Sequence, residues 1–141
     1  MAFSYGFFDA KNLDRIYTAQ NFNDYLSSLI CNGIHDNYGQ CFEITASVNG
    51  LSVTIGTGKA WINGHYFIND SPYVLDLSRY AEQALSKYVI IGICCNTGDN
   101  FREISITVEP GAGADAPEIP SFFETPTETY LTLAAVYLPA G

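Results

Sequence analysis

The sequence predicts a mainly β protein, an antiparallel and β-sandwich-like fold, with one N-terminal amphipathic α-helix at about residues 19–31. Three observations lead to this fold class. Several short runs alternate apolar and polar residues with a period of two, which is typical of strands with one buried face. Asn63-Gly64 separates two apolar-rich runs, as in a tight hairpin. One segment, residues 22–30, spaces its apolar residues as a helix does.

The predicted helix follows Thr18, a residue type that commonly caps helix N-termini. Asn32-Gly33 supplies a signal for its end. One apolar stripe about two turns long runs along this helix, and we expect the stripe to pack into the core of the domain. The stripe consists of Phe22, Tyr25, Leu26, Leu29 and Ile30.

The strands of the first half are separated by two Asn-Gly turns. Residues 42–48 are apolar at every second position, and Asn49-Gly50 then makes a turn. Residues 51–77 are the most informative part of the chain, because two apolar-rich runs fold back on each other at Asn63-Gly64. Both residues of this turn tolerate a positive φ, which a two-residue type I′ hairpin requires. The pattern predicts a rigid β-hairpin that carries bulky aromatic residues.

The second half of the chain contributes three further strands. Residues 88–95 are apolar on both faces, which predicts a central strand. Residues 104–108 alternate as a half-buried strand does, and residues 130–138 form a last strand. Residues 110–129 hold four of the six prolines and predict a long irregular connection over the surface.

We divide the chain into an extended N-terminal arm, residues 1–15, and a single β-rich domain, residues 16–141. The arm contains the apolar segment 4–8 but no periodic pattern. It either adds a strand to its own domain or reaches a neighbouring chain, and we favour the first. The sequence stops soon after its last strand, so we expect this domain to be the N-terminal part of a longer protein.

Composition and charge limit the kinds of partner that we expect this protein to bind. The net charge is −9, and the six Lys and Arg residues are scattered through the chain. Nucleic acids and anionic membranes bind clustered basic side chains, so we expect neither as a partner. The start of the chain carries charges where a signal peptide needs an apolar core. The four cysteines are irregularly spaced, which favours free thiols in a reducing cytoplasm.

No pattern in the sequence predicts a catalytic residue, a cofactor or a metal. Gly56-Thr-Gly58-Lys59 resembles part of a phosphate-binding loop, but the rest of that motif is missing and a strand follows it. Cys31 and His35 lack the paired spacing of structural zinc ligands. His65 flanks the hairpin turn without a recognisable nucleophile or orienting group. The sequence therefore predicts a protein that is not an enzyme.

The candidates for contact with a protein or a glycan lie in the arm and near the hairpin turn, and most of them are aromatic. Alternation places Tyr66 on one face of the hairpin and Phe67 on the other. A large aromatic residue near a tight turn usually packs inward, and we expect this of Trp61. The candidate contact residues are Tyr5, Phe7, Phe8, Trp61, His65 and Tyr66.

The order of the segments along the chain is itself distinctive. The chain carries an arm and then, in order, residues 17–33, 42–48 and 53–66, Asp70, Arg102-Glu-Ile104, and a Pro-rich stretch before residues 130–134. The most specific part is Gly58-Lys-Ala-Trp-Ile-Asn-Gly-His65. This order resembles the N-terminal module of tail, baseplate or receptor-binding structural proteins of phages and prophages of Gram-positive bacteria. The resemblance covers nearly the whole chain. It implies a β-sandwich in a non-enzymatic virion component, made in the cytoplasm of the bacterial host. It also implies a homo-oligomer, with a trimer as one option, that contacts other tail or baseplate proteins.

An alternative function is a carbohydrate-binding module that recognises bacterial cell-wall polysaccharide. Such a module needs exposed aromatic side chains beside hydrogen-bonding groups, and Trp61, Tyr66 or Tyr73 would supply them. A hydrolase is the weakest option, because only the number of carboxylates supports it. The sequence singles out no pair of acids for that chemistry.

Overall fold

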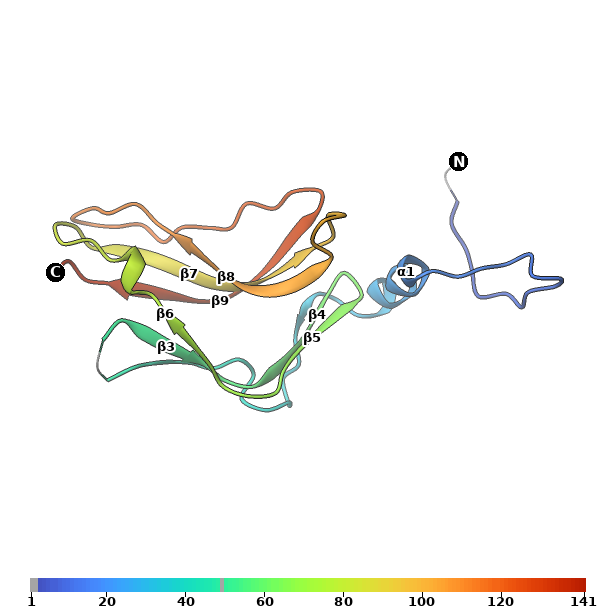
Figure 1. Cartoon of the computed structure of the whole chain (residues 1–141), viewed down its shortest axis with the longest axis horizontal. Helices are drawn as coiled ribbons and strands as arrows, with labels where there is room; N and C mark the ends of the chain where they lie inside the picture. Colours follow the sequence, from blue (N-terminus) through green and yellow to red (C-terminus); the bar gives the residue numbers. More distant parts are fainter. Residues whose placement is uncertain (1–2, 49) are drawn as a thin grey trace.

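The computed structural model describes residues 3–48 and 50–141, and it is mainly antiparallel β with a single short α-helix. Strands in two layers face each other, and the helix lies outside them (Figure 1). The predicted fold class is confirmed. The elements are α1 (Ala19–Leu29), β1 (Gly33–Ile34), β2 (Ile44–Ala46), β3 (Ser52–Ile55), β4 (Gly58–Ile62), β5 (His65–Asn69), β6 (Tyr73–Asp76), the 3-10 helix η1 (Ser78–Tyr80), β7 (Lys87–Asn96), β8 (Glu103–Pro110) and β9 (Glu128–Leu138).

One layer is built on a long, bent hairpin. β3 pairs with β6, and β4 pairs with β5, both antiparallel. The β4–β5 pair continues the β3–β6 pair, so the four strands form one long hairpin. The ribbon is interrupted at Gly56, whose carbonyl oxygen accepts a hydrogen bond from the Asn69 side chain at 2.9 Å. β1 and β2 extend the layer by pairing with β4 and β3. Asn63 and Gly64 both have a positive φ, 51° and 80°, as a type I′ turn requires.

The other layer is the three-stranded sheet β8-β7-β9, with β7 in its centre. The outer face of β7, which includes Ile90 and Gly92, is covered by the Pro-rich connection between β8 and β9. Within that connection the ring of Phe122 lies against Gly92 and stacks on Tyr130, with ring centroids 4.6 Å apart. β7 is therefore buried on both faces, as its sequence predicts, and the connection runs along the top of Figure 1.

The hydrophobic core lies between the two layers. Phe42 stacks on Phe67 with ring centroids 5.9 Å apart. The ring of Phe42 fits there because Gly58 has no side chain, since a Cβ at that position would lie 2.6 Å from the ring. The glycine that suggested a phosphate loop therefore serves core packing. The largest fully buried side chains are Ile55, Ile62, Leu77, Val89, Ile91 and Ile93.

Residues 3–30, which we call the stalk, project from one end of the sandwich (Figure 1). No residue of α1 is buried, so the prediction that its apolar stripe packs into the core is wrong. Residues 3–18 form no strand, so the favoured expectation that the arm adds a strand to this domain is also wrong. Within the described residues, no helix is both long and apolar enough to cross a lipid bilayer.

Two predicted boundaries also shift. The helix ends at Leu29, and Ile30 is already extended, because Asn32 is used to hold the hairpin turn. The strand predicted at 42–48 is confined to β2, and Val48, expected on the buried side, is 99% exposed. Of the turn predicted after it, Asn49 lies outside the described residues.

The stalk, the hairpin and the opposite sheet meet at the Asn63-Gly64 turn. The Asn32 side chain accepts a hydrogen bond from the Asn63 N–H at 2.7 Å and donates one to Asn63 Oδ1 at 3.1 Å. The Asn63 amide also donates to Thr129 Oγ1, on β9, at 2.9 Å. Gly64 lies directly against the helix, since a Cβ there would collide with the Asn23 carbonyl oxygen. One tight turn thus positions three parts of the molecule.

The projecting stalk gives the chain an unusually large surface. Its accessible surface area is 9644 Å². A compact monomer of the same mass is expected to expose about 7,200 Å². We attribute the excess surface area to the stalk, because the stalk buries little of the sandwich surface and little of its own surface is buried.

We predict that Gly64→Ala loosens the attachment of the stalk. The substitution imposes a positive φ on alanine and drives its Cβ into the helix backbone. We expect a loss of about 2–3 kcal/mol in the free energy of unfolding, measured by urea denaturation. Gly50→Ala is the control, because Gly50 has φ 88° but open space around it, and it should cost only about 1 kcal/mol. Equal losses in the two variants would contradict a role for the helix contact.

Candidate interaction site

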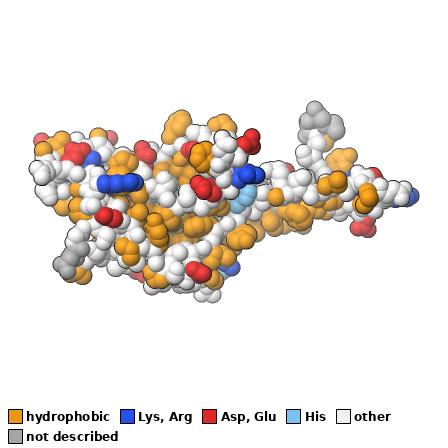
Figure 2. Space-filling view, in the orientation of Figure 1, with side chains coloured by type: hydrophobic (Ala, Val, Ile, Leu, Met, Phe, Trp, Pro, Cys, Tyr) orange, Lys and Arg blue, Asp and Glu red, His pale blue; other side chains and the backbone are white. Residues whose placement is uncertain are grey.

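The stalk presents an apolar face to solvent. Phe22, Tyr25 and Leu29 lie on one side of α1 because they are three and seven residues apart, and they are 55%, 54% and 65% exposed. Figure 2 shows hydrophobic side chains gathered along the stalk. The opposite side of the helix is polar, and there the Gln20 amide donates to the Asp24 carboxylate at 2.6 Å. The stripe remains in solvent because the helix contacts the hairpin through a different side.

The arm folds back along the helix and adds to this face. The ring of Phe7 lies 5.1–5.4 Å from the rings of Tyr17, Phe22 and Tyr25. The Tyr17 hydroxyl accepts a hydrogen bond from the N–H of Phe8 at 2.6 Å and donates one to its carbonyl at 3.1 Å. Phe7 has φ 65°, a left-handed conformation that costs a non-glycine residue about 1 kcal/mol, so the aromatic contacts must offset that cost.

A groove of about 680 Å³ lies between the arm and α1. Tyr5 and Phe7 line it from the arm, and Phe22, Tyr25 and Leu26 line it from the helix. All five of these side chains are large and apolar in their bulk, and each is itself partly in solvent. Ser4, Asn21 and Asp24 also line the groove, so it combines large apolar walls with a few polar groups at its edge.

A second aromatic group lies on the outer face of the hairpin. Trp61 and Tyr66 are direct cross-strand partners, and Tyr66 is 73% exposed. The prediction that Trp61 packs inward is wrong, because its neighbours on β4 take the buried positions. Trp61 instead contacts His35, with ring centroids 5.3 Å apart. Nearby, Lys59 Nζ lies 4.7 Å from the centroid of the Tyr38 ring, a cation–π contact.

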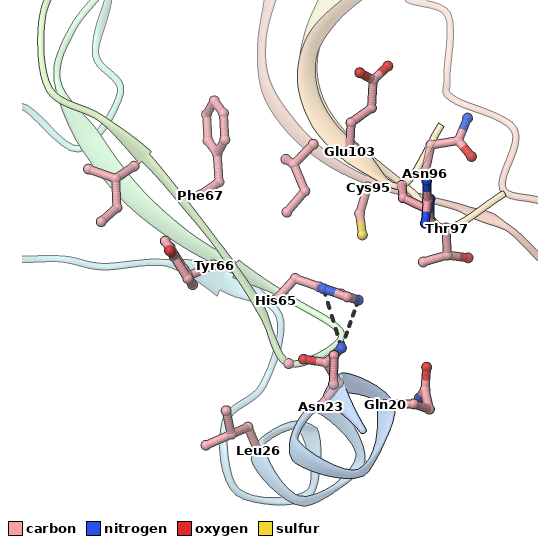
Figure 3. Close-up of a pocket in the computed structure, with 15 residues that line it drawn as sticks. Gln20, Asn23, Leu26, His65, Tyr66, Phe67, Cys95, Asn96, Thr97 and Glu103 are labelled. Atoms are coloured by element: carbon pink, nitrogen blue, oxygen red, sulfur yellow. Dashed lines mark hydrogen bonds between the residues drawn. The ribbon is translucent and has the colours of Figure 1, made fainter. Parts of the chain in front are cut away.

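A cleft of about 860 Å³ lies where α1, β5 and the β7–β8 hairpin come together. His65 and Asn23 face each other at its mouth, with the Asn23 amide nitrogen 3.4 and 3.5 Å from the two ring nitrogens (Figure 3). Arg102, Glu103 and Cys95 line the cleft from the opposite hairpin. The His65 imidazole thus contacts Asn23 of the stalk, and this contact links the hairpin to α1.

Three titratable groups with raised pKa values lie in the β8-β7-β9 sheet: Cys94, Cys95 and Tyr130. The Tyr130 hydroxyl donates to the Glu128 carboxylate at 2.7 Å, and this hydrogen bond raises the pKa of the phenol. Burial raises the pKa of the Cys94 and Cys95 thiols, whereas a nucleophilic thiol requires a lowered pKa. Among the described residues, no group of three or more His, Cys, Asp or Glu side chains is placed to hold a metal ion.

The structure distributes the predicted contact residues over three places. Tyr5, Phe7 and Phe8 lie in the stalk, and Trp61 lies on the hairpin opposite Tyr66. His65 lies in the cleft, which Tyr66 also lines. Sequence reasoning missed the helical stripe as a contact surface, because it assigned the stripe to the core. One signal was available: the first thirty residues are rich in large apolar side chains yet contain no strand pattern.

We predict a clear order of thiol reactivity. Cys31 is exposed, whereas Cys94 and Cys95 are buried and have raised pKa values, so a maleimide should label Cys31 first in the native protein. Cys31→Ser should remove the fastest phase of labelling followed by mass spectrometry. Cys94 and Cys95 should react only when denaturant is added. Rapid labelling of either in the native state would mean that the β7 sheet opens.

We compared the chain with protein-family models, with curated proteins and with solved structures. None of the three comparisons finds a match.

Proposed function

We propose that the chain is a non-enzymatic structural module of a phage or prophage tail, in a baseplate or receptor-binding protein, and that it mediates assembly or attachment to the tail. The observation that carries the proposal is the stalk, an exposed apolar segment held away from a closed β-sandwich. Its partners are other tail or baseplate proteins and further copies of the same chain. The protein is made in the host cytoplasm and ends in the virion.

The exposed apolar face of the stalk argues for assembly. Monomeric proteins seldom expose an apolar patch larger than about 300–600 Å² unless the patch binds something. Six aromatic side chains of the stalk are 42–78% exposed and together present on the order of 700 Å²; they are Phe3, Tyr5, Phe7, Phe8, Phe22 and Tyr25. A stable protein–protein interface buries about 800 Å² on each partner. The stalk therefore has the size and character of one side of an interface.

The placement of the reactive groups argues against catalysis. His65 is engaged with Asn23, and His35 lies against Trp61 and accepts a hydrogen bond from the Asn37 N–H at 3.1 Å. A general base needs a substrate proton within hydrogen-bond reach and a partner that tunes its basicity. These imidazoles connect segments of the fold instead. A rigid structural module fits this arrangement better than an enzyme does.

The tail context follows from the order of segments in the sequence and is tested by locating the chain. We expect mass spectrometry to detect it in purified tail particles from cells that encode it. Phe22→Gln combined with Leu29→Gln should lower the amount bound to particles at least about tenfold, because two anchors of the exposed face are lost. Gln20→Ser with Ser27→Gln changes the polar side of the same helix and should have no effect. Absence of the native chain from the particles would overturn the proposal.

One observation favours the carbohydrate-binding alternative. Trp61 and Tyr66 lie side by side on the outer face of the hairpin, with His35 and Lys59 next to them. Adjacent aromatic faces beside polar groups are suited to stacking against a sugar ring. Under this alternative the sandwich presents the hairpin to cell-wall polysaccharide, and the stalk serves as its attachment.

The fluorescence of Trp61, the single tryptophan, tests this alternative directly. Addition of bacterial cell-wall polysaccharide should change its emission, and Tyr66→Ala should weaken binding roughly tenfold by removing one stacking face. Tyr137→Ala is the control, because Tyr137 is also half exposed but lies on β9. An emission spectrum that no polysaccharide alters would exclude the hairpin as a glycan site.

A further inference from the structure

We infer that the stalk binds the stalk of a second copy of this chain, with the apolar face of α1 in one copy packed on α1 and the arm of the other. This inference rests on the proposed function and names the partner of that interface. Four features of the stalk support it: its area, its charge, its preformed groove and its separation from the sandwich.

The exposed area suits a pairing between copies. The aromatic side chains of the stalk supply on the order of 700 Å², close to the area of about 800 Å² that each partner contributes to a stable complex. Leu29, on the same side of α1 as Phe22 and Tyr25, adds to this surface and is 65% exposed. Association of two identical faces would cover much of the surface that exceeds the value for a compact monomer.

The charge distribution permits identical stalks to approach. Residues 3–30 contain three acids and two bases, which leaves a net charge of −1. The remaining net charge of −8 lies on residues 31–141. Within α1, Asp24 is the one charged residue; it lies at the edge of the groove, and its carboxylate accepts a hydrogen bond from the Gln20 amide. Two stalks therefore meet with little repulsion, although the two chains as a whole repel each other.

The shape of the stalk is self-complementary. Its groove, about 680 Å³ in volume, runs beside the ridge formed by Phe22 and Tyr25. Leu29, which is 65% exposed and is not part of the groove lining, has the size to enter the groove of the other copy, as knobs enter holes between packed helices. In an isologous pair each copy supplies both features, so every such contact occurs twice.

The position of the stalk keeps the acidic sandwiches apart. The stalk extends from one end of the molecule, and the C terminus lies at the other end (Figure 1). Contacts of Asn23 with Gly64 and of Asn32 with Asn63 hold the helix on the hairpin turn, so it cannot fold back onto the core without breaking them. Isolated helices of this length are marginal in water, which gives α1 a further reason to associate.

The same observations disfavour a membrane as the occupant. Helices that lie in a lipid interface carry Lys and Arg along their polar face. The polar side of α1 carries Gln20, Asp24 and Ser27 instead, and α1 has no basic residue. An unrelated tail protein is the other alternative occupant, and the experiment below separates it from a second copy.

The first test measures the mass of the full chain in solution by light scattering and sedimentation across a wide concentration range. We expect reversible self-association of the native chain. Phe22→Gln with Leu29→Gln should weaken it about 100-fold, since two large apolar contacts are lost. Gln20→Ser with Ser27→Gln should leave it unchanged. Circular dichroism and urea unfolding verify that each variant stays folded, as expected for substitutions at exposed positions.

The second test asks which surface lies at the contact. In a Cys31→Ser background, Leu29→Cys should form a disulfide between copies under mild oxidation, whereas Ser27→Cys, on the polar side of the helix, should not. This comparison does not depend on the behaviour of the glutamine variants.

The possible outcomes separate the inference from the proposed function. A native chain that stays monomeric at every concentration overturns self-association, while its presence in tail particles would still support the structural role. An oligomer that the Phe22 and Leu29 substitutions leave intact, or equal trapping by Leu29→Cys and Ser27→Cys, overturns the stalk as the contact. Binding to anionic vesicles by a chain that does not self-associate would assign the face to a membrane and overturn the inference.

Discussion

The Asn63-Gly64 turn is the constraint on which the arrangement of the molecule depends. Its two positive φ angles let β4 and β5 pair directly, which sets the register of the hairpin. Its amide groups bind Asn32 on one side and Thr129 on the other, and its glycine gives the helix backbone room to approach. A side chain at Gly64 would separate the stalk from the sandwich. One dipeptide therefore decides both the local hairpin and the direction of the N-terminal segment.

The sandwich is complete without the stalk. The inward side chains of β3, β4 and β7 fill the space between the layers, and the Pro-rich connection covers the outer face of β7. No further apolar surface of α1 is needed to close this core, which explains why none of its residues is buried. Stability and interaction are thus assigned to different parts of the chain. The proposed structural role would draw on this separation, because an interface on the stalk would leave the core undisturbed.

The residues with catalytic potential take part in structural contacts. His65 faces the helix through Asn23, Tyr130 is held between Glu128 and the ring of Phe122, and the buried thiols have raised pKa values. The aromatic groups that reach solvent lie instead in the stalk and on the outer face of the hairpin. These exposed aromatic groups are the features from which the proposed contacts with proteins or sugars are argued.

Local patterns in the sequence determined the strands, the type I′ turn and the helix, because side-chain alternation, helical spacing and turn propensities act over a few neighbouring residues. The same patterns identified β7 as a central strand from its apolar residues on both faces. The environment of each apolar face was decided only by tertiary structure. The stripe of α1 is exposed because Asn32 bonds to Asn63, 31 residues away, and Asn63 bonds to Thr129, 66 residues away. Trp61 takes the outer face because Ala60 and Ile62 occupy the core positions of β4, and β1 and the loop after it bring His35 against it there. Periodicity records which residues share a face, whereas contacts between distant segments decide whether that face meets the core or the solvent.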